Sequence, residues 1–439
     1  MIVLLLALFS CVSDPSGPGG AEISKPQVFD APLRRLTPAQ YDNTVRDLFV
    51  GIDIPSQEIV ADPAIFGFDN NAAAQVSSAL LVEDYQGAAI AVTAAALAGG
   101  WLPCPLDGGA DPVECGHQVV AEFGHRAFRR PLTEDEAASQ RGFFDEMLAE
   151  EDFEVAVQLA LQAILNSPEF LFFPEFGGEH GRGGHLPLSD YELASRLSYF
   201  LWDAMPDDSL LASAAAGGLS SADQVEEQAW RMLADPRASG ALIRFHDQWM
   251  SLDGLATVSP DAGAYPEWNQ ALRESMEAEM HAFVTATLLG DEPSLSALLT
   301  YRQTTAEPDL AAIYGVEAGA AELPADERAG VLTRAAWLAA TSHSLHPSPV
   351  QRGVFVLERV MCVPVLPPPP DLNTDIPEPT EPTTNRERYE AHTADPACAG
   401  CHRAIDPIGF GFENYDSVGG HQNIDFGVRV DASGAFIDG

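Results

Sequence analysis

The chain has 439 residues, of which 46% are apolar, and its formal net charge is −42 at pH 7. This length exceeds that of one ordinary domain, so two or more subdomains with sizeable cores are expected. The acidic excess argues against nucleic acid as a partner, because nucleic-acid-binding proteins need a basic surface for the phosphates. It is compatible with a solvated acidic surface, and with a basic partner attracted by electrostatic steering.

The first residues have the pattern of an export signal. Residues 2–9 are continuously apolar, which is too short for the roughly 20 residues that span a bilayer but suits the core of a signal peptide. The sequence Leu8-Phe9-Ser10-Cys11 resembles a bacterial lipobox, in which the cysteine becomes the lipidated N-terminus, and the Ser/Gly/Pro-rich residues that follow resemble a tether. The alternative is an ordinary secretory signal with an incidental cysteine, and no Lys or Arg precedes the apolar run. Both interpretations predict an exported protein, either periplasmic or anchored to the outer membrane as a lipoprotein.

Helix signals dominate the rest of the chain, and strand alternation is scarce. Thr37 is an N-cap followed by proline, and capping boxes begin at Thr133 and Ser189. Helical spacing of apolar residues predicts further helices over residues 77–97, 153–165, 222–234, 236–250, 269–289, 325–341 and 349–361. The sequence therefore predicts an all-α protein.

Two loops interrupt the helical pattern. Residues 177–186 are rich in Gly and His, and residues 363–384 contain eight prolines, which is typical of an extended connector between a helical body and a C-terminal module. These breaks predict a signal or lipoprotein segment with its tether, three helical domains, and a final module that includes the connector; the five segments are residues 1–30, 31–100, 101–176, 185–345 and 346–439. Cys104 and Cys115 flank a short Pro/Gly/Asp loop and are expected to close it with a disulfide.

The motif that carries chemistry is Cys398-Ala399-Gly400-Cys401-His402. Cys-x-x-Cys-His is the attachment pattern of haem c, in which the two thiols add to the vinyl groups and the histidine becomes the proximal ligand of the iron. The spacing suits one helical turn and places both sulfurs and the imidazole on one face. The identity of the axial ligands and the burial of the site set the reduction potential of such a haem.

Other functions of these cysteines stay open at this point. A thioredoxin-like redox pair is disfavoured, since no βαβ pattern surrounds the motif. A zinc site formed by Cys362, Cys398, Cys401 and His402 is one alternative, and a structural disulfide is another.

The distal ligand cannot be identified from the sequence. His421 follows the motif, whereas His392 and Met361 precede it. We expect His392 to lie on the helix leading into the motif, which would make it a poor distal ligand. A five-coordinate iron open to small molecules, or a ligand beyond Gly439, is the alternative. No GxSxG, HExxH, Walker or GxGxxG motif suggests another chemistry.

Several stretches resemble a family of exported multi-domain proteins of unknown function, frequent in planctomycetes and myxobacteria, with a cytochrome-c-like C-terminal part. The resembling stretches are residues 33–49 (LRRLTPAQYDNTVRDLF), 123–134 (FGHRAFRRPLTE), 167–173 (SPEFLFF), 191–203 (YELASRLSYFLWD), 348–362 (SPVQRGVFVLERVMC) and 398–419 (CAGCHRAIDPIGFGFENYDSVG). The resemblance implies haem attachment at Cys398, Cys401 and His402, but it implies no activity. Family members continue with a further helical domain, so the chain looks truncated at its C-terminus.

The resemblance extends to two features near the motif. Residues 405–410 match the stretch that follows the haem motif in the family, where they are expected either to wrap the haem edge or to form a structural turn. Cys362 falls where the family also has a cysteine, and the sequence gives it no role.

The leading hypothesis is an exported c-type haem protein, either lipid-anchored or periplasmic, that transfers electrons and can have a redox partner protein. One alternative is a haem-dependent peroxidase or oxygenase with an open iron site. The other is a non-enzymatic scaffold with a zinc or disulfide cysteine cluster.

Overall fold

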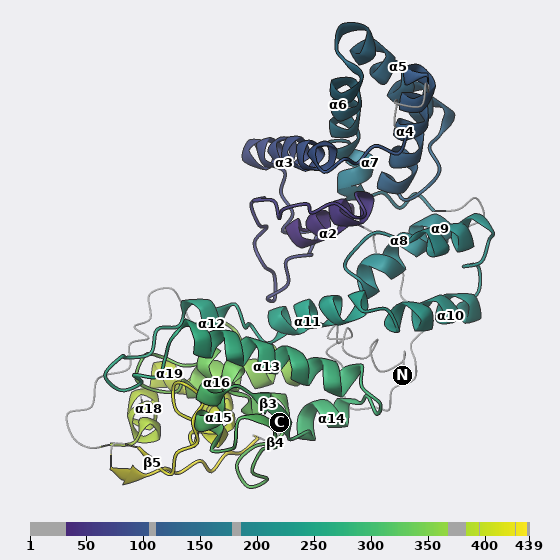
Figure 1. Ribbon diagram of the computed structural model, residues 1–439. Helices are drawn as coiled ribbons and strands as arrows, with labels where there is room; N and C mark the ends of the chain where they lie inside the picture. Colours follow the sequence, from purple (N-terminus) through teal and green to yellow (C-terminus); the bar gives the residue numbers. More distant parts are fainter. Residues whose placement is uncertain are drawn as a thin grey trace. The chain divides into compact units, whose positions relative to one another are not determined.

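The structure is a computed structural model that describes residues 32–104, 111–177, 186–367, 383–394, 396–425 and 427–436 (Figure 1). The chain is all-α, as its sequence predicts, and the sheets within the described residues are small and two-stranded. Three sequence-based predictions fall outside the described residues, wholly or in large part. They concern the signal segment with Cys11, the Gly/His-rich loop 177–186, and the proline-rich connector 363–384.

The chain divides between Ala241 and Leu242 into two compact units. In the first unit, β1 pairs antiparallel with β2, and the other regular elements of its described residues are helices. Its elements are β1 (Arg34–Arg35), α2 (Pro38–Leu48), α3 (Ala79–Ala98), α4 (Pro112–Ala127), α5 (Glu134–Glu150), α6 (Phe153–Leu165), α7 (Pro168–Leu171), β2 (Phe172–Phe173), α8 (Asp190–Leu201), α9 (Asp208–Ala215) and α10 (Ala222–Leu233). Helix α11 (Arg237–Trp249) leads from the first unit into the second.

The second unit contains the remaining elements, including two antiparallel strand pairs, β3–β4 and β5–β6. These elements are α12 (Gly254–Thr257), α13 (Gln270–Leu288), α14 (Leu295–Thr300), β3 (Gln303–Ala306), α15 (Pro308–Tyr314), β4 (Gly319–Glu322), η2 (Val331–Thr333), α16 (Ala335–Ala340), α17 (Pro349–Phe355), η3 (Val356–Val360), α18 (Asn385–Thr393), α19 (Pro396–Gly409), η4 (Phe410–Phe412), β5 (Ile424–Asp425) and β6 (Val428–Arg429).

Three helix starts in the first unit have the capping signals that the sequence predicts. Thr37, Thr133 and Ser189 each form a capping box with the residue three positions later, which satisfies backbone N–H groups that a helix start leaves without partners. Helix α3 is long and apolar enough to cross a membrane by length and composition alone. The face of this helix that carries Tyr85 and Val92 is nevertheless buried in the core of the unit, as in a core helix of a globular protein.

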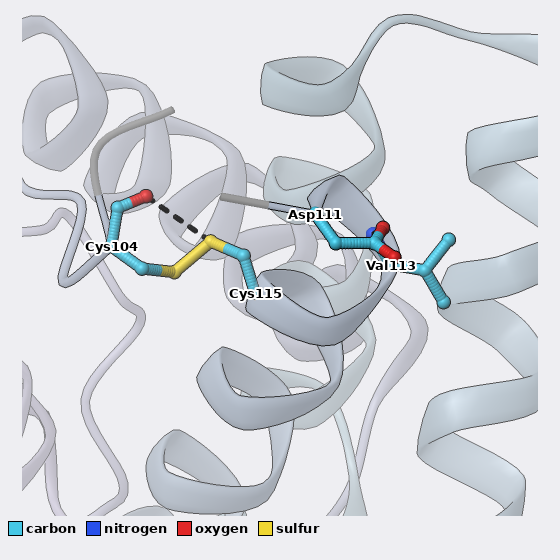
Figure 2. The surroundings of a disulfide bond; sticks show 4 residues. All are labelled: Cys104, Asp111, Val113 and Cys115. Atoms are coloured by element: carbon cyan, nitrogen blue, oxygen red, sulfur yellow. Dashed lines mark hydrogen bonds between the residues drawn. A yellow bond between two sulfur atoms is a disulfide. The ribbon is translucent and has the colours of Figure 1, made fainter. Parts of the chain in front are cut away.

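Cys104 and Cys115 form the disulfide expected from the sequence, with their Cα atoms 5.9 Å apart (Figure 2). Cys115 lies in the first turn of α4, and Asp111 caps this helix by accepting a hydrogen bond of 3.0 Å from the Val113 backbone N–H. The disulfide therefore anchors the chain before the loop to a capped helix start.

The second unit has one hydrophobic core, to which the C-terminal part of the chain contributes. Ile405, Ile408 and Tyr415 belong to the same buried cluster as Met276 and the fully buried Trp337. The segment that carries the cysteine motif is therefore packed into the helices that precede the proline-rich connector.

Helices α17 and α19 approach each other closely at two glycines. A Cβ atom on Gly409 would lie 1.9 Å from the Pro349 carbonyl oxygen, and one on Gly353 would lie 2.3 Å from the Ile405 carbonyl oxygen. Both separations are far inside van der Waals contact, so only glycine permits this crossing.

Two predicted helices differ from the observed ones. The helix expected over residues 325–341 is only η2 followed by α16, because Arg328 donates to the Thr333 carbonyl oxygen, and the Thr333 hydroxyl bonds to the backbone at Ala329. These side-chain bonds hold a turn in place of the first helical turns. The helix expected over residues 349–361 is present, but its second half, η3, is a π-helix.

Candidate functional site

The cysteine motif lies on α19, next to α18 in the second unit (Figure 1). Cys398, Cys401 and His402 all fall in one continuous helix, in agreement with their spacing. Cys398 is buried, whereas Cys401 is exposed. The two thiols therefore differ in their access to solvent, although they are less than one helical turn apart.

Neither thiol of the motif is in a disulfide. Among the described residues, moreover, no three His, Cys, Asp or Glu side chains come close enough together to hold a metal ion. The Cys₃His zinc site considered from the sequence is thus not formed by Cys362, Cys398, Cys401 and His402, and a structural disulfide between Cys398 and Cys401 is not formed either. The free Cys-x-x-Cys-His pattern is what haem c attachment requires.

His402 is held by a carboxylate on its own helix. Its Nδ1 lies 2.8 Å from Oδ1 of Asp406, whose side chain is only 6% exposed. Histidines that bind metals commonly donate one ring N–H to a carboxylate, which fixes the ring and leaves the other nitrogen for the metal. With the proton on Nδ1, Nε2 of His402 is the free acceptor, so this arrangement fits an axial haem ligand.

A pocket of about 470 Å³ opens beside His402. This volume lies within the range of ordinary cofactor and ligand pockets. The walls come from α18, α19, η4 and the chain near the C-terminus; the lining residues are Arg386, Glu390, Thr393, Ala399, His402, Arg403, Asp406, Pro407, Phe410, Ser433, Gly434 and Ala435.

Arg386 holds two walls of this pocket together. Its guanidinium lies over the Phe410 ring, 4.6 Å from the centroid, and Nη1 donates a hydrogen bond of 2.7 Å to the Ser433 carbonyl oxygen. The backbone N–H of Ala435 also donates to the Pro407 carbonyl oxygen at 3.0 Å. The pocket is therefore bounded by tethered chain segments.

Residues 405–410 do not form the structural turn considered from the sequence. They continue α19 and enter η4, with Pro407 inside the helix. Asp406, Pro407 and Phe410 line the pocket. The stretch thus supplies both the partner of His402 and part of the pocket wall.

The three candidates for a distal ligand lie in different surroundings. His392 is on α18, a helix separate from α19, and its ring centroid is 6.0 Å from that of His402. Helix α18 ends at Thr393 and α19 begins at Pro396, so His392 lies, as expected, on the helix that leads into the motif. His421 instead packs on Tyr415 and pairs with Glu327 at 3.4 Å, and Met361 is 44% exposed at the end of η3.

The start of α18 is fixed by a buried carboxyl group. The side-chain amide of Asn385 donates to both carboxyl oxygens of Glu413, at 3.2 and 3.0 Å, and its backbone N–H donates to Asp425 at 2.9 Å. Burial, the largest influence, raises the pKa of Glu413 to about 7, although Asn385 and Arg352 act in the opposite direction.

Arg352 of α17 fastens the segment after α19. Its guanidinium is fully buried and donates to the carbonyl oxygens of Phe412 and Tyr415, and to Leu338 and Ser342 on the other side. Burial lowers the pKa of Arg352 to about 10, while nearby acids and tyrosines oppose that shift.

Asp406 and Arg352 were not identified from the sequence. The i, i+4 spacing from His402 to Asp406 on a predicted helix could have revealed the first. Arg352 has no local signal, since none of the partners of its guanidinium is closer than 10 positions and Phe412 and Tyr415 lie about 60 positions further along the chain.

Four family models match consecutive parts of the chain. PSD3 (DUF1587) matches residues 34–98, PSD5 (DUF1595) 115–175, PSD4 (DUF1592) 188–316 and PSCyt3 (DUF1588) 328–425, and each is described as a protein of unknown function. The chain belongs to this multi-domain family of planctomycetes and myxobacteria. The PSCyt3 part, whose name suggests a cytochrome-like module, contains Cys398, Cys401 and His402. No curated protein and no solved structure matches the chain.

Proposed function

We propose that this family member is an exported c-type haem protein that transfers electrons. The observation that carries the proposal is the arrangement on α19. Two cysteines outside any disulfide precede a histidine whose Nδ1 is paired with the buried Asp406 and which lines a pocket. This donor set is the one that covalent haem attachment uses.

In this proposal Cys398 and Cys401 would hold the haem through two thioether bonds, each formed when an S–H bond adds across one vinyl group, with sulfur on one vinyl carbon and hydrogen on the other. No oxidant or reductant is consumed. His402 would hold the iron through Nε2, and Asp406 orients its ring through the contact at Nδ1. The bound iron supplies a one-electron couple. Arg386 and Arg403 line the pocket and place positive charge beside the proposed haem site.

The proposed location is outside the cytoplasm, with a lipid anchor at Cys11 as the sequence suggests. The Cys104–Cys115 disulfide supports export, since such bonds persist in oxidising compartments. The strongly acidic chain favours a redox partner with a basic surface, because opposite charges accelerate encounter.

Expression of the full chain with a haem c maturation system tests the attachment. We expect covalent haem in the pyridine haemochrome assay and a protein mass increased by one haem. The variant Cys398→Ala/Cys401→Ala should lose the haem, whereas the matched control Cys104→Ala/Cys115→Ala should retain it. A wild-type protein without covalent haem would refute the proposal.

Fractionation of the native host tests the location separately. We expect the protein in the outer-membrane fraction, and Cys11→Ser should release it or block its processing. A cytoplasmic wild-type protein would contradict export without affecting the haem assignment.

A peroxidase or oxygenase is the second candidate, and the pocket beside His402 is the observation in its favour, because it offers space for a small molecule. An enzyme of this type needs an iron with an open position. A high-spin spectrum that changes on adding peroxide would favour it over electron transfer.

A further inference from the structure

His392 is the histidine whose ring packs against that of His402. The two ring centroids are 6.0 Å apart, and the ring planes are inclined at 74°. Within the described parts of the chain, no hydrogen bond or ion pair engages the imidazole of His392. His421, by contrast, is paired with Glu327 and packs on Tyr415.

The separation of these rings suits two ligands of one metal ion. Imidazole nitrogens lie about 2 Å from a first-row metal ion, so two axial nitrogens stand about 4 Å apart. When the distance from each coordinating nitrogen to the centroid of its ring is added, the two centroids lie roughly 6 Å apart. The observed 6.0 Å agrees with this value, and an inclination of 74° is compatible with axial rings crossed about a common axis.

The helix that carries His392 is held in position at its start. Thr384 forms a capping box with Glu387, and Asn385 bonds to the buried Glu413 of the segment after α19. Helix α18 also packs directly against α19. A ligand carried by a capped and anchored helix is positioned more accurately than one on a loop.

We propose that His392 is the distal axial ligand, so that the haem is bound by two histidines, His402 on one side and His392 on the other. The inference rests on the proposed haem attachment and deepens it. A second protein ligand fills the coordination shell of the iron, which favours electron transfer over binding of a small substrate.

The test compares variants of the full-length protein matured with covalent haem. Wild type should show a six-coordinate, low-spin optical and electron paramagnetic resonance spectrum. His392→Ala should become high-spin and bind carbon monoxide roughly tenfold faster or more, because the competing ligand is gone. Added imidazole should restore the low-spin spectrum. The matched control His421→Ala should remain like wild type.

A second variant covers the case in which His392→Ala does not fold. His392→Met offers a thioether at the same place, so we expect six-coordinate iron with a sulfur-ligand signature and a higher reduction potential. A low-spin spectrum of His392→Ala without added imidazole, or no sulfur signature in His392→Met, would overturn the distal assignment while covalent haem persists. A wild-type protein without covalent haem would instead remove the proposed function, and this inference with it.

Discussion

Asp406 and His402 stand one helical turn apart on α19, with 2.8 Å between a carboxylate oxygen and Nδ1 of the ring. Such a partner makes the imidazole a stronger electron donor to a metal bound at its other nitrogen. The pair therefore links the local geometry of the helix to the redox properties proposed for the site.

Replacing Asp406 by Asn should raise the reduction potential of the haem. The neutral amide lacks the negative charge that would stabilise the oxidised iron. A tenfold change in the relative stability of the two oxidation states corresponds to about 59 mV for one electron. A spectroscopic redox titration measures this shift. Glu390→Gln is the control, because Glu390 also lines the pocket but has no bond to His402. Equal shifts of the reduction potential in both variants would argue against a specific effect of Asp406.

Gly409→Ala should destabilise the second unit by about 1–3 kcal/mol through overpacking. The added methyl group would meet the Pro349 carbonyl oxygen at 1.9 Å, and α17 and α19 would have to move apart. Gly411→Ala is the matched control, since its new Cβ would have nothing within 4 Å. Thermal unfolding of both variants tests the contact, and similar melting temperatures would show that the crossing tolerates a methyl group.

Arg352→Lys should cost about 3 kcal/mol or more, because a single ammonium cannot replace a buried guanidinium that donates to several carbonyl oxygens. Denaturant unfolding measures the loss. Arg302→Lys, at a partly exposed ion pair with Glu322, should cost less than about 1 kcal/mol. Equal costs at the two positions would contradict the structural role assigned to Arg352.

The buried Glu413 predicts a stability that falls as the pH rises. Because the folded-state pKa of Glu413, about 7, lies above its ordinary value of 4.5, the carboxyl group favours the folded state fully below pH 4.5. This contribution, up to about 3 kcal/mol, is lost as the pH rises through 7. Comparing the unfolding free energy of wild type and Glu413→Gln between pH 4.5 and 8 isolates it.

The glutamine variant keeps an acceptor for Asn385 but cannot ionise. The wild-type curve should therefore fall below that of Glu413→Gln as the pH approaches 8. Parallel curves for the two proteins over this range would mean that Glu413 titrates as an ordinary exposed acid.

The parts of the fold that the sequence predicts correctly depend on neighbours along the chain. The capping box at Thr37 joins residues three positions apart, and the disulfide from Cys104 to Cys115 closes a short loop. The motif on α19 is likewise local. Composition and short-range spacing are enough to predict such features.

The remaining features depend on packing between distant segments. Asn385 donates a hydrogen bond to Glu413, which is 28 positions away in the sequence, and Arg352 donates to carbonyl groups about 60 positions away. The closeness of the His392 and His402 rings could not be predicted either, because it depends on how α18 and α19 pack against each other. No local pattern encodes these distances, since they result from how the helices pack against one another.

The shared core of the second unit limits how the chain can be divided. Ile405 and Tyr415 pack in one cluster with Met276 and Trp337, which come before the connector. A fragment that starts at residue 346 would therefore expose an apolar surface to water, and we expect it to aggregate. The segment with the cysteine motif is therefore not expected to fold independently, and its transfer to another protein would have to include the helices from Leu242 onward.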